Sequence, residues 1–148
     1  MLQTLIVDDE KRGRELLKMI LATNCPEVKV IGEASNTKEA YQMILQSEPD
    51  LVLLDIEMPG GTGFDLLSKF DEVNFDVLFI TAFDQYAIKA IKFSAMDYIL
   101  KPVDEEELIK AIKRAEENRN RKNNKEKVNT LIANVQKSSN HQKIGLTS

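Results

Sequence analysis

Short, mostly apolar runs recur along the chain and alternate with stretches in which apolar residues follow a helical spacing. Residues 2–7, 51–54 and 77–80 form three of these runs. Their nearly continuous apolar character is typical of strands that are buried on both faces, as in a parallel sheet between two layers of helices. The pattern therefore predicts three central strands.

Two further runs, at residues 28–33 and 97–100, have a different character. The first is interrupted by Lys29 and Gly32, and the second is short. A charged residue is tolerated more easily on an edge strand than on a central one. We place these two strands at the edges, which gives the strand order 2-1-3-4-5.

Between the strands, apolar residues recur with the period of an amphipathic helix. Five stretches show this period: Leu16, Leu17, Ile20 and Leu21; Ala40, Met43 and Ile44; Phe64, Leu67 and Phe70; Ala87, Ala90 and Ile91; Leu108, Ile112 and Ala115. Asn36 before Glu39 and Asp104 before Glu107 have capping-box spacing and predict where the second and fifth helices begin. The alternation predicts an α/β fold, a doubly wound five-stranded parallel sheet flanked by five helices.

Polar residues with reactive or charged side chains follow four of the predicted strands. Asp8 and Asp9 come after the first, Asp55 after the third, Thr81 after the fourth and Lys101 after the fifth. The carboxyl ends of parallel strands line the binding crevice of an open sheet, so these side chains can converge. Taken singly, each is more often a helix cap, a turn former or a surface residue. Their common position at successive strand ends favours a functional site.

Three carboxylates in one place repel each other unless a cation neutralises them. Mg²⁺ prefers oxygen ligands, so the predicted ligands are the side chains of Asp9 and Asp55, Asp8 directly or through water, and the main-chain carbonyl of Glu57. With the metal bound, Asp55 can act as a nucleophile toward phosphorus. Thr81 could then donate a hydrogen bond to a phosphoryl oxygen, and Lys101 could supply a cation to another.

Composition sets the broad class of the protein. The chain has 148 residues, 43% of them hydrophobic, which is enough for one domain and a tail. Its single cysteine and the lack of a secretory signal or of an apolar stretch of about 20 residues predict a soluble cytoplasmic protein with no membrane contact. The net charge of -4 argues against a general nucleic-acid-binding surface.

The C-terminal part of the chain has another character from about residue 116. Residues 118–127 carry five basic side chains and no apolar one, and predict a linker or a solvated helical extension over 119–142. Val128, Leu131, Ile132 and Val135 then form a short apolar stripe at helical spacing. A helix this short is marginal by itself, so the stripe needs something to pack on.

The ordered set of Asp8-Asp9, Asp55 within LVLLDIEMPGGTGFDLL, Thr81-Ala82 and YILKP ending at Pro102 resembles a response-regulator receiver domain. The resemblance covers about residues 1–118 and implies the flavodoxin-like receiver fold. It implies that Asp55 accepts a phosphoryl group from the phosphohistidine of a sensor histidine kinase. It also implies a Mg²⁺ site at Asp8, Asp9, Asp55 and the Glu57 carbonyl, a cis peptide bond before Pro102, and a switch in which Thr81 and Tyr98 move together.

A narrower resemblance concerns TAFDQYAIKAIKFSAMDYILKP, which is similar to the same stretch of LytTR-type regulators. The receivers of these regulators precede a DNA-binding domain, and residues 143–148 resemble the opening strand of that domain. The resemblance implies a fragment of a transcription regulator that contacts DNA only through a C-terminal domain mostly missing here. We expect a homodimer when the chain is phosphorylated.

The competing hypothesis is a Mg²⁺-dependent phosphohydrolase that forms an aspartyl-phosphate intermediate. Such enzymes usually carry a second Asp two residues after the nucleophile. Here the residue two positions after Asp8 is Glu10, and the residue two positions after Asp55 is Glu57. The chain also has no cap domain to select a substrate. The sequence therefore favours a regulatory phosphoacceptor over an enzyme acting on external substrates.

Overall fold

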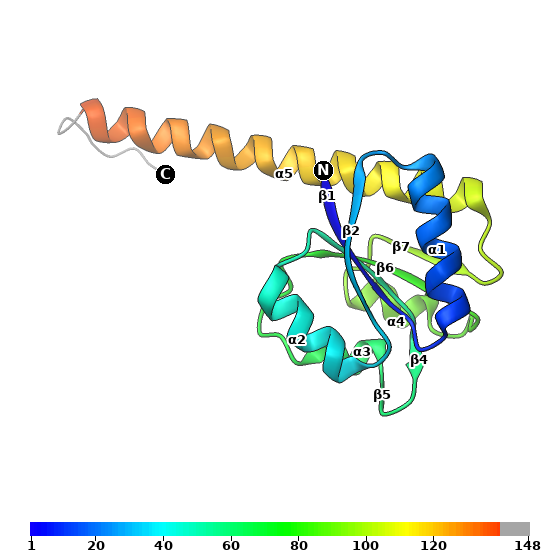
Figure 1. Cartoon of the computed structure of the whole chain (residues 1–148). Helices are drawn as coiled ribbons and strands as arrows, with labels where there is room; N and C mark the ends of the chain where they lie inside the picture. The colour runs from blue at the N-terminus through cyan, green and yellow to red at the C-terminus, as the bar shows by residue number, and fades with distance from the viewer. Residues whose placement is uncertain (140–148) are drawn as a thin grey trace. The chain divides into compact units, whose positions relative to one another are not determined.

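The computed structural model describes residues 1–139, and its main feature is a five-stranded parallel sheet (Figure 1). The strands of this sheet are β1 (Leu2–Val7), β2 (Val28–Ala34), β3 (Leu51–Leu54), β6 (Asp76–Thr81) and β7 (Asp97–Leu100). Their order is β2-β1-β3-β6-β7. The five predicted strands and their order are confirmed, since β6 and β7 are the fourth and fifth strands of this sheet.

Each central strand contributes alternate residues to two separate cores. Leu5, Val52 and Val77 face one core, whereas Ile6, Leu53 and Leu78 face the other. Both faces are dry because helices cover both of them, which explains why these strands are apolar at almost every position. The edge strand β2 is mostly half-buried, as the interruptions by Lys29 and Gly32 predict.

Five helices flank the sheet in two layers (Figure 1). They are α1 (Lys11–Asn24), α2 (Thr37–Ser47), α3 (Gly63–Ser68), α4 (Ala87–Lys92) and α5 (Glu105–Ser139). Residues of α2, α3 and α4 pack in the first core, and residues of α1 and of the start of α5 pack in the second. The confirmed fold is thus a doubly wound sandwich with the sheet as its middle layer.

The helix starts follow local capping chemistry. The Asn36 side chain accepts a hydrogen bond from the Glu39 backbone N–H at 2.9 Å, so the predicted start of α2 is confirmed. Glu39 itself does not close the box on Asn36, because its carboxylate accepts hydrogen bonds from Ser35 instead. Asp104 caps the start of α5 by accepting from the Glu106 N–H at 3.0 Å.

Two residues of the predicted helical stripes are exposed rather than buried. Leu16 is 40% exposed on α1, and Ile91 is 74% exposed on α4. In α4 only Ala90 is fully buried, because the helix has six residues and presents a narrow strip to the sheet. The periodicity found these helices but overstated the width of their buried faces.

The sequence pattern also missed a small second sheet. Strands β4 (Glu57–Met58) and β5 (Gly61–Thr62) pair antiparallel directly after β3. Gly60 between them has φ +87°, a left-handed conformation that glycine adopts at little cost. The hairpin ends in Thr62, which forms a capping box with Asp65 and starts α3. The chain that follows Asp55 therefore forms a hairpin that leads directly into α3.

The chain divides into two compact units, Met1–Glu116 and a second unit that begins at Glu117. The first unit holds the sheet and both cores. In the second, α5 continues to Ser139, and the apolar stripe is exposed on it, with Leu131 at 63% and Val135 at 65%. The predicted start of an output domain at 143–148 lies outside the described residues. Within residues 1–139, no helix is long and apolar enough to cross a membrane.

Candidate functional site

The predicted site residues lie at the carboxyl edge of the main sheet. Val7 pairs with Leu54, so Asp8 and Asp55, the next residues, leave adjacent strands side by side. Thr81 ends β6 and pairs with Leu100, and the Lys101 backbone N–H donates to the Thr81 carbonyl at 2.8 Å. The parallel register alone brings these residues, far apart in sequence, to one edge.

Three carboxylates form the centre of the site. Asp8, Asp9 and Asp55 each offer one oxygen, and these oxygens lie within 4.8 Å of one another. Asp8 and Asp55 are buried, whereas Asp9 is exposed. Asp9 also lines a pocket with residues of the β2–α2 loop and of the hairpin. The cluster is therefore open to solvent on the side of Asp9.

Lys101 is the cation that faces the two buried carboxylates. Its Nζ lies 2.7 Å from Asp8 Oδ2 and 2.9 Å from Asp55 Oδ2. The remaining oxygens of these carboxylates accept backbone hydrogen bonds, Asp8 Oδ1 from Glu10 at 2.9 Å and Asp55 Oδ1 from Ile56 at 2.6 Å. The side-chain positions are thus fixed by one shared ammonium and two local N–H donors.

Electrostatics in the site follow from burial and crowded charge. Partial burial, followed by the charges of Asp8 and Asp55, raises the pKa of Asp9 above 3.8. Burial by itself would lower the pKa of the Lys101 ammonium, but hydrogen bonds to Asp8 and Asp55 outweigh it, and this pKa is raised above 10.5. Lys101 is therefore charged at neutral pH, and Asp9 adds a negative charge that the ammonium does not pair.

Two glycines that sequence reasoning missed shape the site. A Cβ on Gly13 would lie 2.6 Å from Asp8 Oδ2, and a Cβ on Gly63 would lie 2.6 Å from the Asp55 carbonyl oxygen. Helix α1 can approach the Asp8 carboxylate only because position 13 has no side chain. Glycine in the first turn of a predicted helix, next to an acid cluster, is the signal that could have pointed to Gly13.

Thr81 and Tyr98 lie on the two strands beside this cluster. Thr81 is fully buried, and its hydroxyl accepts a hydrogen bond from the Phe83 N–H at 3.4 Å. The half-buried Tyr98 donates its hydroxyl to the Phe83 carbonyl. Within residues 1–139, neither hydroxyl is hydrogen-bonded to the acid cluster. The structure thus joins Thr81 and Tyr98 through Phe83.

Glu57 and Pro102 complete the set of predicted site residues. Glu57 begins β4, and its exposed carboxylate accepts a hydrogen bond from the Tyr86 hydroxyl at 3.1 Å. The peptide bond between Lys101 and Pro102 is cis. Sequence reasoning gave no role to Tyr86, and nothing in the local pattern would have paired it with a residue 29 positions away.

The donor set fits a hard divalent cation. Three carboxylate oxygens within 4.8 Å of one another, one of them from an exposed side chain, match the oxygen ligands and partial hydration that Mg²⁺ prefers. Burial and then the charges of Asp8 and Asp55 raise the pKa of Asp9, and a bound cation would offset those charges.

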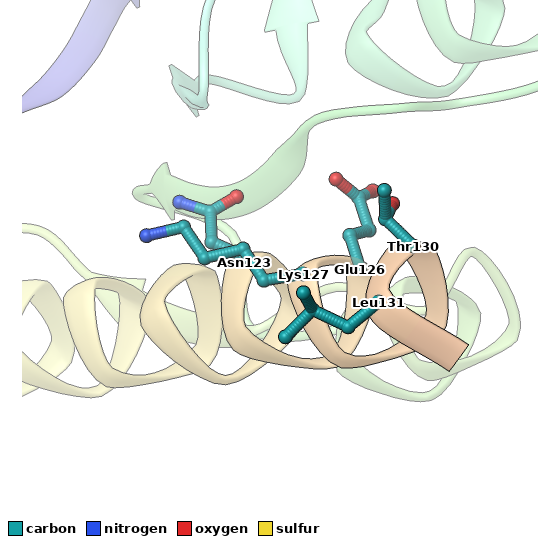
Figure 2. A pocket seen from close by; sticks show the side chains of 5 residues that line it. All are labelled: Asn123, Glu126, Lys127, Thr130 and Leu131. Carbon is teal, nitrogen blue, oxygen red and sulfur yellow. The ribbon is translucent and has the colours of Figure 1, made fainter. Parts of the chain in front are cut away.

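A second pocket lies on the C-terminal part of α5 (Figure 2). The described residues that line it are Asn123, Glu126, Lys127, Thr130 and Leu131. All five come from one helix, and none of them is a predicted site residue (Figure 2).

Comparison with known proteins agrees with this geometry. The family model of the response regulator receiver domain matches residues 4–113. An uncharacterized response regulatory protein of Vibrio cholerae is 48% identical over 115 residues, which cover 77% of this chain and 48% of the relative. The sensory transduction protein LytT of Bacillus cereus is 40% identical over 116 residues, 77% of this chain and 47% of the relative. The chain spans about half the length of these relatives.

Solved structures lead to the same family. The response regulator TrrA from Thermotoga maritima, in complex with Mg²⁺ and BeF, is 32% identical with a TM-score of 0.67, and the match covers 78% of this chain and 99% of that one. The family suggested by Asp8-Asp9, Asp55, Thr81 and Lys101 is thus found independently by sequence and by structure. The chain belongs to the response regulator receiver domain family.

Proposed function

We propose that Asp55 is the phosphoacceptor of this receiver and takes its phosphoryl group from the phosphohistidine of a sensor histidine kinase. The observation that carries the proposal is the convergence of Asp8, Asp9 and Asp55 within 4.8 Å, with the Lys101 ammonium on Asp55. Family membership gives the chain a regulatory role and does not favour the phosphohydrolase alternative.

In the proposed transfer, a carboxylate oxygen of Asp55 attacks the phosphorus. The new P–O bond forms as the P–N bond of the phosphohistidine breaks. The electron pair of that P–N bond returns to the donor imidazole. Lys101 stabilises negative charge on a phosphoryl oxygen, and the Thr81 hydroxyl donates to another. Asp8, Asp9, Asp55 and the Glu57 carbonyl would hold Mg²⁺, which supplies positive charge to offset the phosphoryl oxygens.

The proposed output is a conformational switch. When Thr81 turns toward a phosphoryl oxygen, it leaves its hydrogen bond with Phe83, the residue whose carbonyl also accepts from Tyr98. One movement at the site can therefore shift the Tyr98 ring and the face formed by α4, β7 and α5. An allosteric change of this kind favours a homodimer.

The domain organisation of the longer protein is also part of the proposal. Residues 1–118 form the receiver, 119–142 a linker or helical extension, and 143–148 the start of a DNA-binding output domain of LytTR type. DNA contact would come only from that output domain. A cytoplasmic location is also part of the proposal, because the proposed phosphoryl donor is a sensor histidine kinase.

The direct test is phosphorylation by a small donor. The chain is incubated with acetyl phosphate and Mg²⁺, and intact mass is measured for the wild type, Asp55→Asn and the exposed control Asp71→Asn. We expect one added phosphoryl group on the wild type and on Asp71→Asn, and none on Asp55→Asn. Multiple turnover of added phosphoesters without accumulation would instead support the phosphohydrolase.

A further inference from the structure

Tyr86 makes a long-range contact that none of the roles above uses. Its hydroxyl donates to Glu57 Oε2 at 3.1 Å across 29 positions of sequence. Glu57 lies two residues after Asp55, at the start of β4, and Tyr86 immediately precedes α4. The hydrogen bond to Glu57 raises the pKa of the Tyr86 hydroxyl above 10.0, so Tyr86 stays a proton donor at neutral pH.

Aromatic packing fixes the Tyr86 ring. Its centroid lies 5.9 Å from that of Phe64 and 6.3 Å from that of Phe83, both in edge-on arrangements. Phe64 is buried and packs in turn on Phe79 and Phe93, at 5.1 Å and 5.2 Å. The hydroxyl is therefore presented from the core, whereas the Glu57 side chain that it holds is exposed and would otherwise be free to move.

We infer that Tyr86 is a positioning residue that restrains the Glu57 carboxylate and thereby lengthens the lifetime of the phosphoryl group on Asp55. The inference rests on the proposed phosphoacceptor role of Asp55. It assigns to this chain a control of signal duration that acts through one side-chain hydrogen bond.

The chemical reason lies in the hydrolysis of an aspartyl phosphate. A water oxygen attacks phosphorus, the bond from phosphorus to the Asp55 oxygen breaks, and its electron pair returns to the Asp55 carboxylate. The proton that the water loses passes to a base. Glu57 is an exposed carboxylate two residues from Asp55, and its Oε2 is occupied while Tyr86 donates to it. Removing the Tyr86 hydroxyl frees that oxygen to accept the proton.

The test measures the decay of phosphorylated protein after acetyl phosphate is removed, with Mg²⁺ kept present. Four chains form a double-mutant cycle: wild type, Tyr86→Phe, Glu57→Gln, and the double variant. Phenylalanine keeps the ring that packs on Phe64, so the cycle changes the hydrogen bond and leaves the aromatic core. We expect decay in Tyr86→Phe to be about three- to tenfold faster than in the wild type, a small part of what a well-placed general base contributes.

The double variant decides whether Tyr86 acts through Glu57. We expect the phosphorylated double variant to decay at the same rate as phosphorylated Glu57→Gln. Without the Glu57 carboxylate, loss of the Tyr86 hydroxyl frees no base.

Tyr41→Phe is the matched control. Tyr41 is a half-buried tyrosine on α2, and its ring centroid lies 5.0 Å from that of Phe70. Phosphorylated Tyr41→Phe should decay at the wild-type rate. Unchanged or slower decay in Tyr86→Phe, or the same acceleration in the Glu57→Gln background, would overturn the inference alone. A wild type that never acquires a phosphoryl group would overturn the proposed function and this inference with it.

Discussion

Lys101 carries one ammonium group between two buried carboxylates. Each ion is costly to remove from water, and only close opposite charges and hydrogen bonds offset that cost. Here the Lys101 side chain is 20% exposed, and its Nζ lies 2.7 Å from Asp8 Oδ2 and 2.9 Å from Asp55 Oδ2. The arrangement leaves net negative charge in the cluster, and the stability of the free protein depends on keeping Lys101 in place.

Replacing Lys101 with Met should therefore destabilise the protein by on the order of 2–4 kcal/mol, because two buried carboxylates lose their cation. Urea unfolding in the presence of a chelator measures this loss. The exposed control Lys110→Met should stay close to the wild type. A Lys101→Met protein as stable as the control would mean that the two carboxylates are already relieved by other groups or by solvent.

Replacing Asp9 should stabilise the protein, the opposite of the effect expected for Lys101→Met. The folded pKa of Asp9 is raised, so the charged form costs stability once the pH rises above the ordinary value of 3.8. Asp9→Asn should stabilise the metal-free protein at pH 7 by about 0.5–1 kcal/mol, a small effect because Asp9 is exposed and solvent screens the repulsion. Chemical unfolding at several pH values should show the gain shrinking toward zero below about pH 4.

Added Mg²⁺ provides the second half of that experiment. A ligand that binds only the folded state stabilises it by RT ln(1 + [L]/Kd). Mg²⁺ should raise the melting temperature of the wild type clearly more than that of Asp9→Asn. Equal shifts in the two proteins would show that Asp9 is no ligand.

Among single residues, the sequence predicted which side chains lie at one edge of the sheet, but not the hydrogen bonds that their neighbours make. Asp8, Asp9, Asp55, Thr81 and Lys101 were found because strand ends in a parallel sheet share one edge. The hydrogen bonds of Tyr86 to Glu57 and of Tyr98 to Phe83 depend on how loops fold back, which no local periodicity encodes. The steric role of Gly13 depends on how closely one helix approaches the acid cluster.

Helix α1 and strand β2 are joined by a network of ion pairs. Glu33 accepts hydrogen bonds from Arg14 Nε at 2.8 Å and from Lys18 Nζ at 2.6 Å. The Arg14 guanidinium also donates to the Asp8 carbonyl at 2.8 Å. The edge strand is thereby fastened to the helix that packs over Asp8.

This network predicts a pH dependence with a defined sign. Hydrogen bonds from Lys18 and then Arg14 lower the pKa of Glu33 below 4.5, so the network stabilises the fold above that pH and loses its effect as the pH falls through the folded pKa. Glu33→Gln should be less stable than the wild type at pH 7, and the difference should close in acid. Glu72→Gln, an exposed control, should show no such trend in thermal unfolding.

The elements themselves were largely predictable because burial on both faces leaves a clear sequence pattern. Strands β1, β3 and β6 are buried at nearly every position, and the edge strand β2 reveals itself by Lys29. The hairpin of β4 and β5 was missed because a two-residue strand is too short to repeat the two-residue period of a strand. Helix α4 was found only in outline, since Ile88 and Ile91 are both 74% exposed and face away from the core.

At the scale of the whole molecule, the exposed apolar stripe on α5 bears on assembly. Val128, Leu131, Ile132 and Val135 are each more than half exposed at helical spacing. Phosphorylation, or a beryllium fluoride mimic with Mg²⁺, should shift the chain from monomer to dimer in sedimentation velocity. Leu131→Glu should weaken that dimer by about tenfold, which corresponds to 1.4 kcal/mol.

Thr130→Glu is the control for Leu131→Glu. It adds the same charge to α5, but position 130 lies outside the apolar stripe. Full modification that leaves a monomer would reject the assembly. Equal weakening by Leu131→Glu and Thr130→Glu would attribute the effect to charge and remove the stripe from the interface.

The contact between Lys101 and Asp8 joins residues 93 positions apart, the last strand of the sheet to the first. A growing chain that has emerged only as far as β6 already carries all three acids but lacks the ammonium that completes their arrangement. The site proposed for phosphotransfer is therefore complete only once β7 and Lys101 have been synthesised and are in place. In a copy truncated before Lys101, the site proposed for phosphotransfer would lack this ammonium and would stay incomplete.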